Sequence, residues 1–232
     1  MSWRHPRLWR YARVRRRVAD RFVAGEGLEI GALHSPFPVP ASARVRYVDR
    51  MPTARLRAEY PELAAEPLVE VDVVEDGETL AGIAGGSQDF VIASHFLEHC
   101  EDPIGALEAH LRVLRPGGVL LLALPDRRRG IDARRAPTPV THLLADHADG
   151  GAGSRAQHYR EWAELVDLPL GTVGPEGVAA RAAALQARRY AIHFHAWTLE
   201  ELAALLEHLD LPAAVVQRRA NQHEFLVVLR RS

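Results

Sequence analysis

The chain has 232 residues, of which 47% are hydrophobic and 25% are charged, and its formal net charge is −1. This composition excludes a disordered or fibrous protein and predicts one globular domain with an insertion. The near-neutral charge gives no general attraction to polyanions, so we expect no nucleic-acid partner. Cys100 is the only cysteine, which excludes an intramolecular disulfide and a thiolate zinc cluster. No apolar run is long enough to span a bilayer, and we expect a cytoplasmic protein.

The first segment, from Trp3 to Val23, combines many arginines with apolar residues at three- and four-residue spacing. This spacing predicts a basic amphipathic helix, to which we assign residues 1–24. Docking on the chain's own core or on a second copy is favoured over binding to a membrane or to phosphate groups. A homo-oligomer or a partner-subunit contact through this helix is therefore a possible use of the segment.

Three acidic residues stand at the ends of successive predicted strands, which cover residues 28–31, 44–48 and 68–74. They are Glu29, Asp49 and Asp72. Ligands of open α/β sheets bind at the carboxyl ends of the strands. A carboxylate there accepts two hydrogen bonds from a vicinal diol, so the three acids mark a candidate binding edge.

The loop after the first strand contains Pro36, Pro38 and Pro40. Proline lacks the amide donor and biases the preceding residue away from helical geometry, so we expect no helix directly after this strand. A dinucleotide pyrophosphate needs a glycine-rich turn that opens onto a helix N-terminus, and this segment has neither. The sequence therefore argues against a nicotinamide-dependent dehydrogenase.

A fourth strand is predicted at residues 89–93 and is followed directly by His95, Glu98 and His99. This spacing also matches the H-x-x-E-H pattern of zinc proteases. That pattern requires a continuous helix to bring both histidines to one face, whereas here a strand precedes His95 and a new helix is predicted over 103–114. We therefore disfavour a protease.

The stretch from Ser94 to Pro103 and the Arg-Pro-Gly-Gly turn at 115–118 resemble the second half of a class I S-adenosylmethionine (SAM) dependent methyltransferase core. Two strands predicted at 213–218 and 224–229 resemble the hairpin that closes the sheet of that family. The resemblance implies a Rossmann-like α/β fold with a mostly parallel seven-stranded sheet and a lid inserted after strand 5. It assigns residues 25–126 and 196–232 to the core and residues 127–195 to the substrate lid.

The same resemblance implies SAM as the cofactor. It assigns Asp49 to the ribose hydroxyls, Asp72 to the adenine amino group and the Val73 amide to the adenine ring. Glu29 and Gly31 match the family's first motif, whereas Leu33 stands where a further glycine is usual. The full set of predicted cofactor-binding residues is Glu29, Gly31, Ala32, His34, Asp49, Asp72, Val73, Ser94 and His95.

The predicted lid is rich in histidine and arginine. A histidine with a pKa near neutrality can accept a proton from a hydroxyl or amine as it attacks a methyl group, so His158, His193 and His195 are the candidate catalytic residues. The candidate substrate-binding residues are Arg127, Tyr159 and Trp197. The three histidines could instead share a metal with Asp126, but we assign no metal site from the sequence.

The predicted function is methyl transfer from SAM to oxygen, nitrogen or carbon of a small-molecule acceptor by in-line displacement. The incomplete first motif leaves a second enzyme hypothesis, in which the same fold catalyses SAM-independent chemistry such as an elimination or a ring closure. A third hypothesis is a noncatalytic partner subunit that docks through the N-terminal helix.

Overall fold

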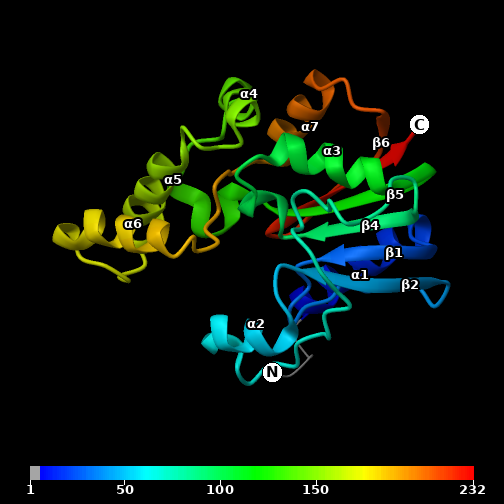
Figure 1. Ribbon diagram of the computed structural model, residues 1–232, viewed down its shortest axis with the longest axis horizontal. Coiled ribbons are helices and arrows are strands. Elements are labelled where there is room, and N and C mark those ends of the chain that lie inside the picture. The colour runs from blue at the N-terminus through cyan, green and yellow to red at the C-terminus, as the bar shows by residue number, and fades with distance from the viewer. Residues whose placement is uncertain (1–5) are drawn as a thin grey trace.

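The computed structural model describes residues 6–232 and contains one seven-stranded sheet (Figure 1). The strand order is β3-β2-β1-β4-β5-β7-β6, and β7 runs antiparallel to both β5 and β6. The predicted Rossmann-like, mostly parallel sheet is therefore confirmed. The strands are β1 Gly25–Ile30, β2 Ala43–Asp49, β3 Val73–Val74, β4 Gln88–Ser94, β5 Leu114–Pro125, β6 Ala213–Asn221 and β7 Glu224–Arg231.

Helices cover both faces of this sheet. The helix that follows β4 starts where the Asp102 side chain accepts a hydrogen bond from the Gly105 amide, and the helix before β6 starts with a capping box between Thr198 and Glu201. The helices are α1 Pro6–Phe22, α2 Thr53–Glu59, α3 Pro103–Val113, α4 Val140–Asp149, α5 Arg155–Trp162, α6 Val178–Ala187 and α7 Leu199–His208.

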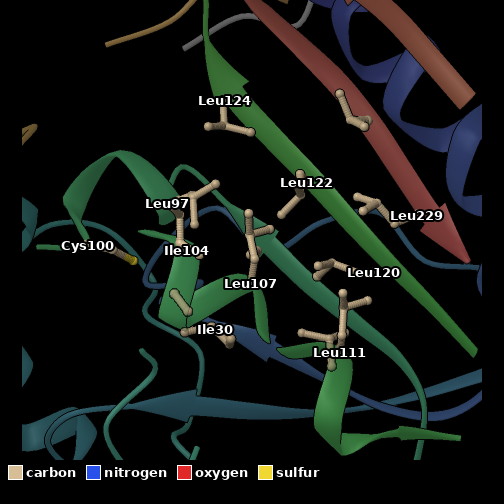
Figure 2. Packing of buried hydrophobic residues seen from close by; sticks show 14 of the residues in the cluster. Ile30, Leu97, Cys100, Ile104, Leu107, Leu111, Leu120, Leu122, Leu124 and Leu229 are labelled. Atoms are coloured by element: carbon tan, nitrogen blue, oxygen red, sulfur yellow. The ribbon is translucent and has the colours of Figure 1, made fainter. Parts of the chain in front are cut away.

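The larger hydrophobic core lies between the sheet and helices α3 and α7. Figure 2 shows one side of α3 facing β5, with Leu107 and Leu111 near Leu120 and Leu122. These leucines are at most 1% exposed, and full burial of each contributes about 1.5–3 kcal/mol. The central strands are buried on both faces, which explains their nearly continuous apolar sequence.

The opposite face of the sheet is covered by α1. Val18, Ala19 and Val23 are buried there in one cluster with Phe90 and Ile92 of β4. The predicted N-terminal helix thus packs on the core of its own chain. Trp3 and its neighbours at positions 1–5 lie outside the described residues.

The segment 127–195, which we call the insertion, contains α4, α5 and α6 and lies beyond the carboxyl ends of the parallel strands (Figure 1). It has a hydrophobic cluster of its own that includes Trp162, Val166 and Leu185. The chain leaves and re-enters the core at one place, because Asp126 pairs with Trp197 as an isolated parallel bridge. The insertion is therefore anchored at the edge where ligands of such sheets bind.

Two local expectations have different outcomes. Residues 31–42 contain no helix, as the prolines predicted. The predicted strand 68–74 is wrong in length, because β3 has only two residues. The amide of Val69 donates to the Leu33 carbonyl and that of Val71 to the Thr53 hydroxyl, so these residues bond to a loop and a helix. The chain first bonds to the sheet at Asp72, whose amide donates to the Tyr47 carbonyl of β2. Among residues 6–232, no helix is long and apolar enough to cross a membrane.

Candidate active site

A cavity of about 500 Å³ opens at the carboxyl ends of β1, β2 and β4, and part of the insertion forms its far wall. Its volume is in the usual range for a small-molecule site. Its lining is partly acidic and partly aromatic. The residues that line it are Ile30, Gly31, Leu33, Asp49, Arg50, Tyr60, Glu62, Leu63, Asp76, Gly77, Glu78, His95, Phe96, His99, Glu101, Tyr159, Arg189, Tyr190, Ala191 and Phe194.

Two glycines shape the bottom of this cavity. Gly31 follows β1 with φ of +65°, a left-handed conformation that L side chains rarely adopt. A Cβ atom on Gly77 would lie 2.5 Å from the Ile30 side chain and 2.7 Å from the Phe96 ring, so only glycine fits there. The backbone at these positions can therefore approach a ligand closely.

Asp49 is the predicted cofactor-binding acid that lies in the cavity. Its Oδ1 atom accepts a hydrogen bond of 2.7 Å from the Arg50 amide, which orients the carboxylate at the end of β2. Burial raises the pKa of Asp49, although the Arg50 amide and guanidinium oppose this effect. The structure thus brings Asp49 together with Gly31 and His95, two further predicted residues.

The other predicted acids lie outside the cavity. Glu29 is fully buried below the following loop, where it accepts a hydrogen bond of 2.8 Å from the Phe37 amide, and burial raises its pKa to about 7. Asp72 is exposed and accepts a hydrogen bond from the Tyr47 amide. Asp76, four residues later, lines the cavity instead. The short β3 accounts for this change of register.

Four more predicted residues are near the site but do not line the cavity. Val73 belongs to β3, and Ala32 and His34 belong to the loop that follows Gly31. The Ser94 hydroxyl accepts a hydrogen bond from Arg15 of α1, on the side of β4 that faces this helix. Sequence reasoning could not distinguish these neighbours from lining residues, because that distinction depends on where the loop turns.

His95 has an unusual conformation and environment. It has a φ of +52°, and its Nε2 atom lies 3.1 Å from Glu224 Oε2 while Nδ1 lies 3.4 Å from Glu98 Oε1. Burial acts to lower the pKa of His95, but the two carboxylates outweigh burial and raise it to about 9. The imidazole is therefore cationic near neutral pH and is a poor proton acceptor there. The positive φ also ends any helix at this position, which argues against the zinc-protease interpretation.

We expect the contribution of His95 to stability to depend on pH. Because the pKa is about 9 in the folded protein and about 6.5 in the unfolded chain, this contribution is fully present below about pH 6.5 and is lost as the pH rises through about 9. Chemical denaturation of the wild type and of His95→Gln at a series of pH values measures the free energy of unfolding of each protein. The difference between the two free energies should shrink at alkaline pH. A difference that is constant across this window would contradict the ion-pair assignment.

Comparison with known proteins agrees with this geometry. Residues 24–122 match the family described as "Methyltransferase domain". This stretch, which runs from β1 into β5, is similar to a methyltransferase domain. No curated protein sequence matches the chain significantly.

Solved structures of methyltransferases have the same fold. A SAM-dependent methyltransferase from Aquifex aeolicus has a TM-score of 0.52 at 12% identity and covers 98% of this chain and 94% of its own. A Thermotoga maritima methyltransferase described as a possible histamine N-methyltransferase has a TM-score of 0.50 at 15% identity, covering 97% and 94%. A complex between the Haloferax volcanii Trm112 methyltransferase activator and the putative methyltransferase has a TM-score of 0.52 at 13% identity. The match covers 96% of this chain and 89% of that one. At such identities the likeness shows the fold.

Only one of the three candidate substrate-binding residues lines the cavity. Tyr159 of α5 does so, and its hydroxyl donates to the Tyr190 carbonyl, which ties two parts of the insertion together. Arg127 instead contacts Glu201 and the Arg135 carbonyl, and Trp197 is buried in the main core. Arg189, which the sequence analysis did not single out, lines the rim.

The three predicted catalytic histidines are not among the lining residues of the cavity, nor do they meet at Asp126. His193 Nδ1 lies 2.7 Å from Asp132 Oδ2, while Asp126 is paired with Arg128. His158 and His195 lie in a separate buried cluster. The alternative of one metal shared by these histidines and Asp126 is therefore wrong.

Two titratable residues missed from the sequence line the cavity. His99 is held by a contact of 2.9 Å between its Nδ1 atom and the Ile192 carbonyl, and burial followed by repulsion from His193 lowers its pKa to about 4. Glu78 faces the amides of Glu101 and Asp102, and burial raises its pKa to about 7. No local sequence pattern indicates either role, since each depends on burial by distant segments.

Proposed function

We propose that the protein transfers a methyl group from SAM to oxygen, nitrogen or carbon of a small-molecule acceptor that binds against the insertion. The observation that carries this proposal is the cavity at the ends of β1, β2 and β4, with the Asp49 carboxylate directed by the Arg50 amide. In a doubly wound sheet this is the position where nucleoside ligands bind.

The residues of the cavity fit the polar groups of SAM. Asp49 is suited to the ribose diol, because one carboxylate can accept two hydrogen bonds. Asp76 replaces Asp72 in our assignment as the acceptor for the adenine amino group, since it lines the cavity and Asp72 does not. The methionine end would lie near Gly31, with the amides of Ala32 and His34 as donors for its carboxylate. When bound, SAM supplies the electrophilic methyl group.

The acceptor is assigned to the side of the cavity formed by the insertion. Tyr159, Tyr190 and Phe194 provide aromatic surface there, and Arg189 provides a cation at the rim. These residues would act mainly by orienting the acceptor behind the methyl group, which is the chief source of catalysis in such a transfer. Among the acids of the cavity, Glu78 is suited to take up a proton because its pKa is about 7.

The test is calorimetric titration of the purified protein with SAM and with S-adenosylhomocysteine. We expect micromolar binding of both compounds at one site per chain. Absence of binding to both, by a protein whose circular dichroism shows that it is folded, would reject the proposal. Acceptor screening with isotopically labelled SAM then follows, with a labelled product as the expected result.

Leu33 supports one alternative function. It lines the cavity with φ of +48°, at the position where the family motif usually has a glycine. Its side chain therefore occupies space near the expected methionine end of SAM. If the labelled-SAM assay gives no methylated product with any acceptor, an elimination or ring closure in this fold becomes the favoured activity.

A further inference from the structure

A buried cluster of three histidines and one aspartate lies in the insertion, outside the proposed cofactor site. His142 and Asp146 are one turn apart on α4, His158 comes from α5, and His195 precedes the return to the core. One donor atom from each residue lies within 4.8 Å of the donor atoms of the others. Segments distant in sequence thus converge on one point through imidazole and carboxylate groups.

The separations between these donor atoms match a tetrahedral metal site. Asp146 Oδ2 lies 3.1 Å from His142 Nε2, 3.6 Å from His158 Nε2 and 3.7 Å from His195 Nε2. His142 Nε2 and His158 Nε2 are 3.1 Å apart. Zinc bound to nitrogen and oxygen at about 2.0–2.1 Å in a tetrahedron separates its ligand atoms by about 3.3–3.4 Å. The measured distances lie on both sides of that value.

The cluster also contains a polar group that lacks a satisfactory partner. Asp146 is 2% exposed, and its Oδ2 atom has no hydrogen-bond partner of acceptable geometry among residues 6–232, although three imidazole nitrogens surround it. The His158 and His195 side chains are buried as well, and imidazole nitrogen is a common zinc ligand.

We propose that His142, Asp146, His158 and His195 bind one Zn²⁺ ion. Nitrogen and carboxylate donors in a tetrahedral arrangement favour zinc over magnesium or calcium, which prefer oxygen ligands in larger coordination shells. Four protein ligands close the coordination sphere, which is typical of a structural and not a catalytic zinc site. The ion joins α4 and α5 to the segment that returns to the core.

This site has a consequence for the cavity. Tyr159 follows the ligand His158, and Phe194 precedes the ligand His195, and both of these neighbours line the cavity. Cross-linking their backbones through one ion would hold the wall of the cavity in place. The proposal does not depend on the identity of the ligand that binds there.

The other group of potential ligands in the described residues is Glu98, His99 and His193. It is a weaker candidate because it offers three ligand residues and not four, although the Glu98 carboxylate also lacks a hydrogen-bond partner among the described residues. We therefore place the zinc ion only in the cluster around Asp146.

The test uses untagged full-length protein, stripped with a chelator and titrated with ZnCl2 by calorimetry. We expect one equivalent of zinc per chain, and visible absorption bands of tetrahedral cobalt when CoCl2 is used instead. His142→Ala should lower zinc affinity by at least about 100-fold, because it removes one ligand of four. His208→Ala, a variant at an exposed histidine of α7, serves as the matched control and should bind as the wild type does.

His142 is the most exposed ligand, with 28% of its side chain accessible, so its replacement is expected to leave the chain folded, as circular dichroism would verify. Zinc should raise the melting temperature of the stripped wild type by several degrees and leave that of His142→Ala nearly unchanged. Binding of less than half an equivalent by the folded wild type would overturn the proposal. Equal zinc affinity of wild type and His142→Ala would overturn it as well. Neither result bears on SAM binding, which is measured separately.

Discussion

Asp49→Ala is expected to weaken SAM binding about 100-fold. A carboxylate that accepts two hydrogen bonds from the ribose contributes about 3 kcal/mol to binding, and each 1.4 kcal/mol corresponds to a factor of ten. The side chain lies at the end of β2 and lines the cavity, and its hydrogen bond from the Arg50 amide is local to the loop. Its removal should therefore affect the ligand more than the fold. Calorimetric titration with SAM and with S-adenosylhomocysteine measures the change.

Asp72→Ala is the matched control for this experiment. Asp72 has the same side chain and stands at the next strand of the sheet, but it is exposed and its contact is the Tyr47 amide. We expect the affinity of this variant to stay within about threefold of the wild type. If Asp49→Ala binds SAM as well as the wild type does, the ribose assignment is wrong. A large loss of affinity in Asp72→Ala would restore the assignment of Asp72 to the adenine amino group that the sequence suggested.

The sequence contained enough information to predict the sheet and one side of the site. The buried strands read as apolar runs, and the ends of β1, β2 and β4 follow from them, so Gly31, Asp49 and His95 could be located at the edge of the sheet where the cavity opens. These predictions depend on short-range patterns. The capping box of α7 was predictable for the same reason, because both of its partners lie within one turn.

The register near β3 could not be predicted in this way. Residues 68–74 have the composition of a strand, but the Val69 and Val71 amides bond to Leu33 and Thr53, and the chain bonds to β2 only from Asp72 onward. The chain then turns so that Asp76 reaches the cavity and Asp72 does not. A tertiary contact with a distant loop thus overrode a local preference.

The insertion shows a similar limit. His142 and Asp146 are four residues apart in α4, and this spacing places both side chains on one face of a helix. Nothing in the local sequence indicated that His158 and His195 would join them, because these residues belong to segments that meet only when the insertion packs. The proposed roles of these histidines therefore changed from catalysis to metal binding once the packing was visible.

Glu224→Ala is expected to reduce the free energy of unfolding by about 3–5 kcal/mol. Glu224 is 1% exposed at the start of β7, and its carboxylate accepts hydrogen bonds from Tyr11, Arg15 and Asn221 and lies 3.1 Å from His95 Nε2. Removing it leaves the buried Arg15 guanidinium and the His95 cation without their partner, and an unpaired buried charge carries a cost of this size. Chemical denaturation of both proteins provides the measurement.

Asp20→Ala is the control for this variant, because Asp20 forms an exposed ion pair with Arg16 on the same helix and should change stability by less than about 0.5 kcal/mol. The double variant Arg15→Met/Glu224→Leu replaces both partners. It should lower the free energy of unfolding by less than the sum of the losses in the two single variants, since neither charge of that pair is left unpaired.

The pH dependence of the Glu224 effect provides an independent check. Burial acts to raise the pKa of Glu224, but hydrogen bonds from His95 and Arg15 outweigh it and lower the pKa to about 2. The stabilising contribution of Glu224 is therefore present at pH values above about 4.3, the pKa of a glutamate in the unfolded chain, and it is lost as the pH falls through about 2. The difference in stability between wild type and Glu224→Ala should shrink across that window. If Glu224→Ala loses less than about 1 kcal/mol of the free energy of unfolding at neutral pH, water or a rearranged Arg15 replaces the carboxylate. The ion pair between Arg15 and Glu224 would then not be what holds α1 to β7.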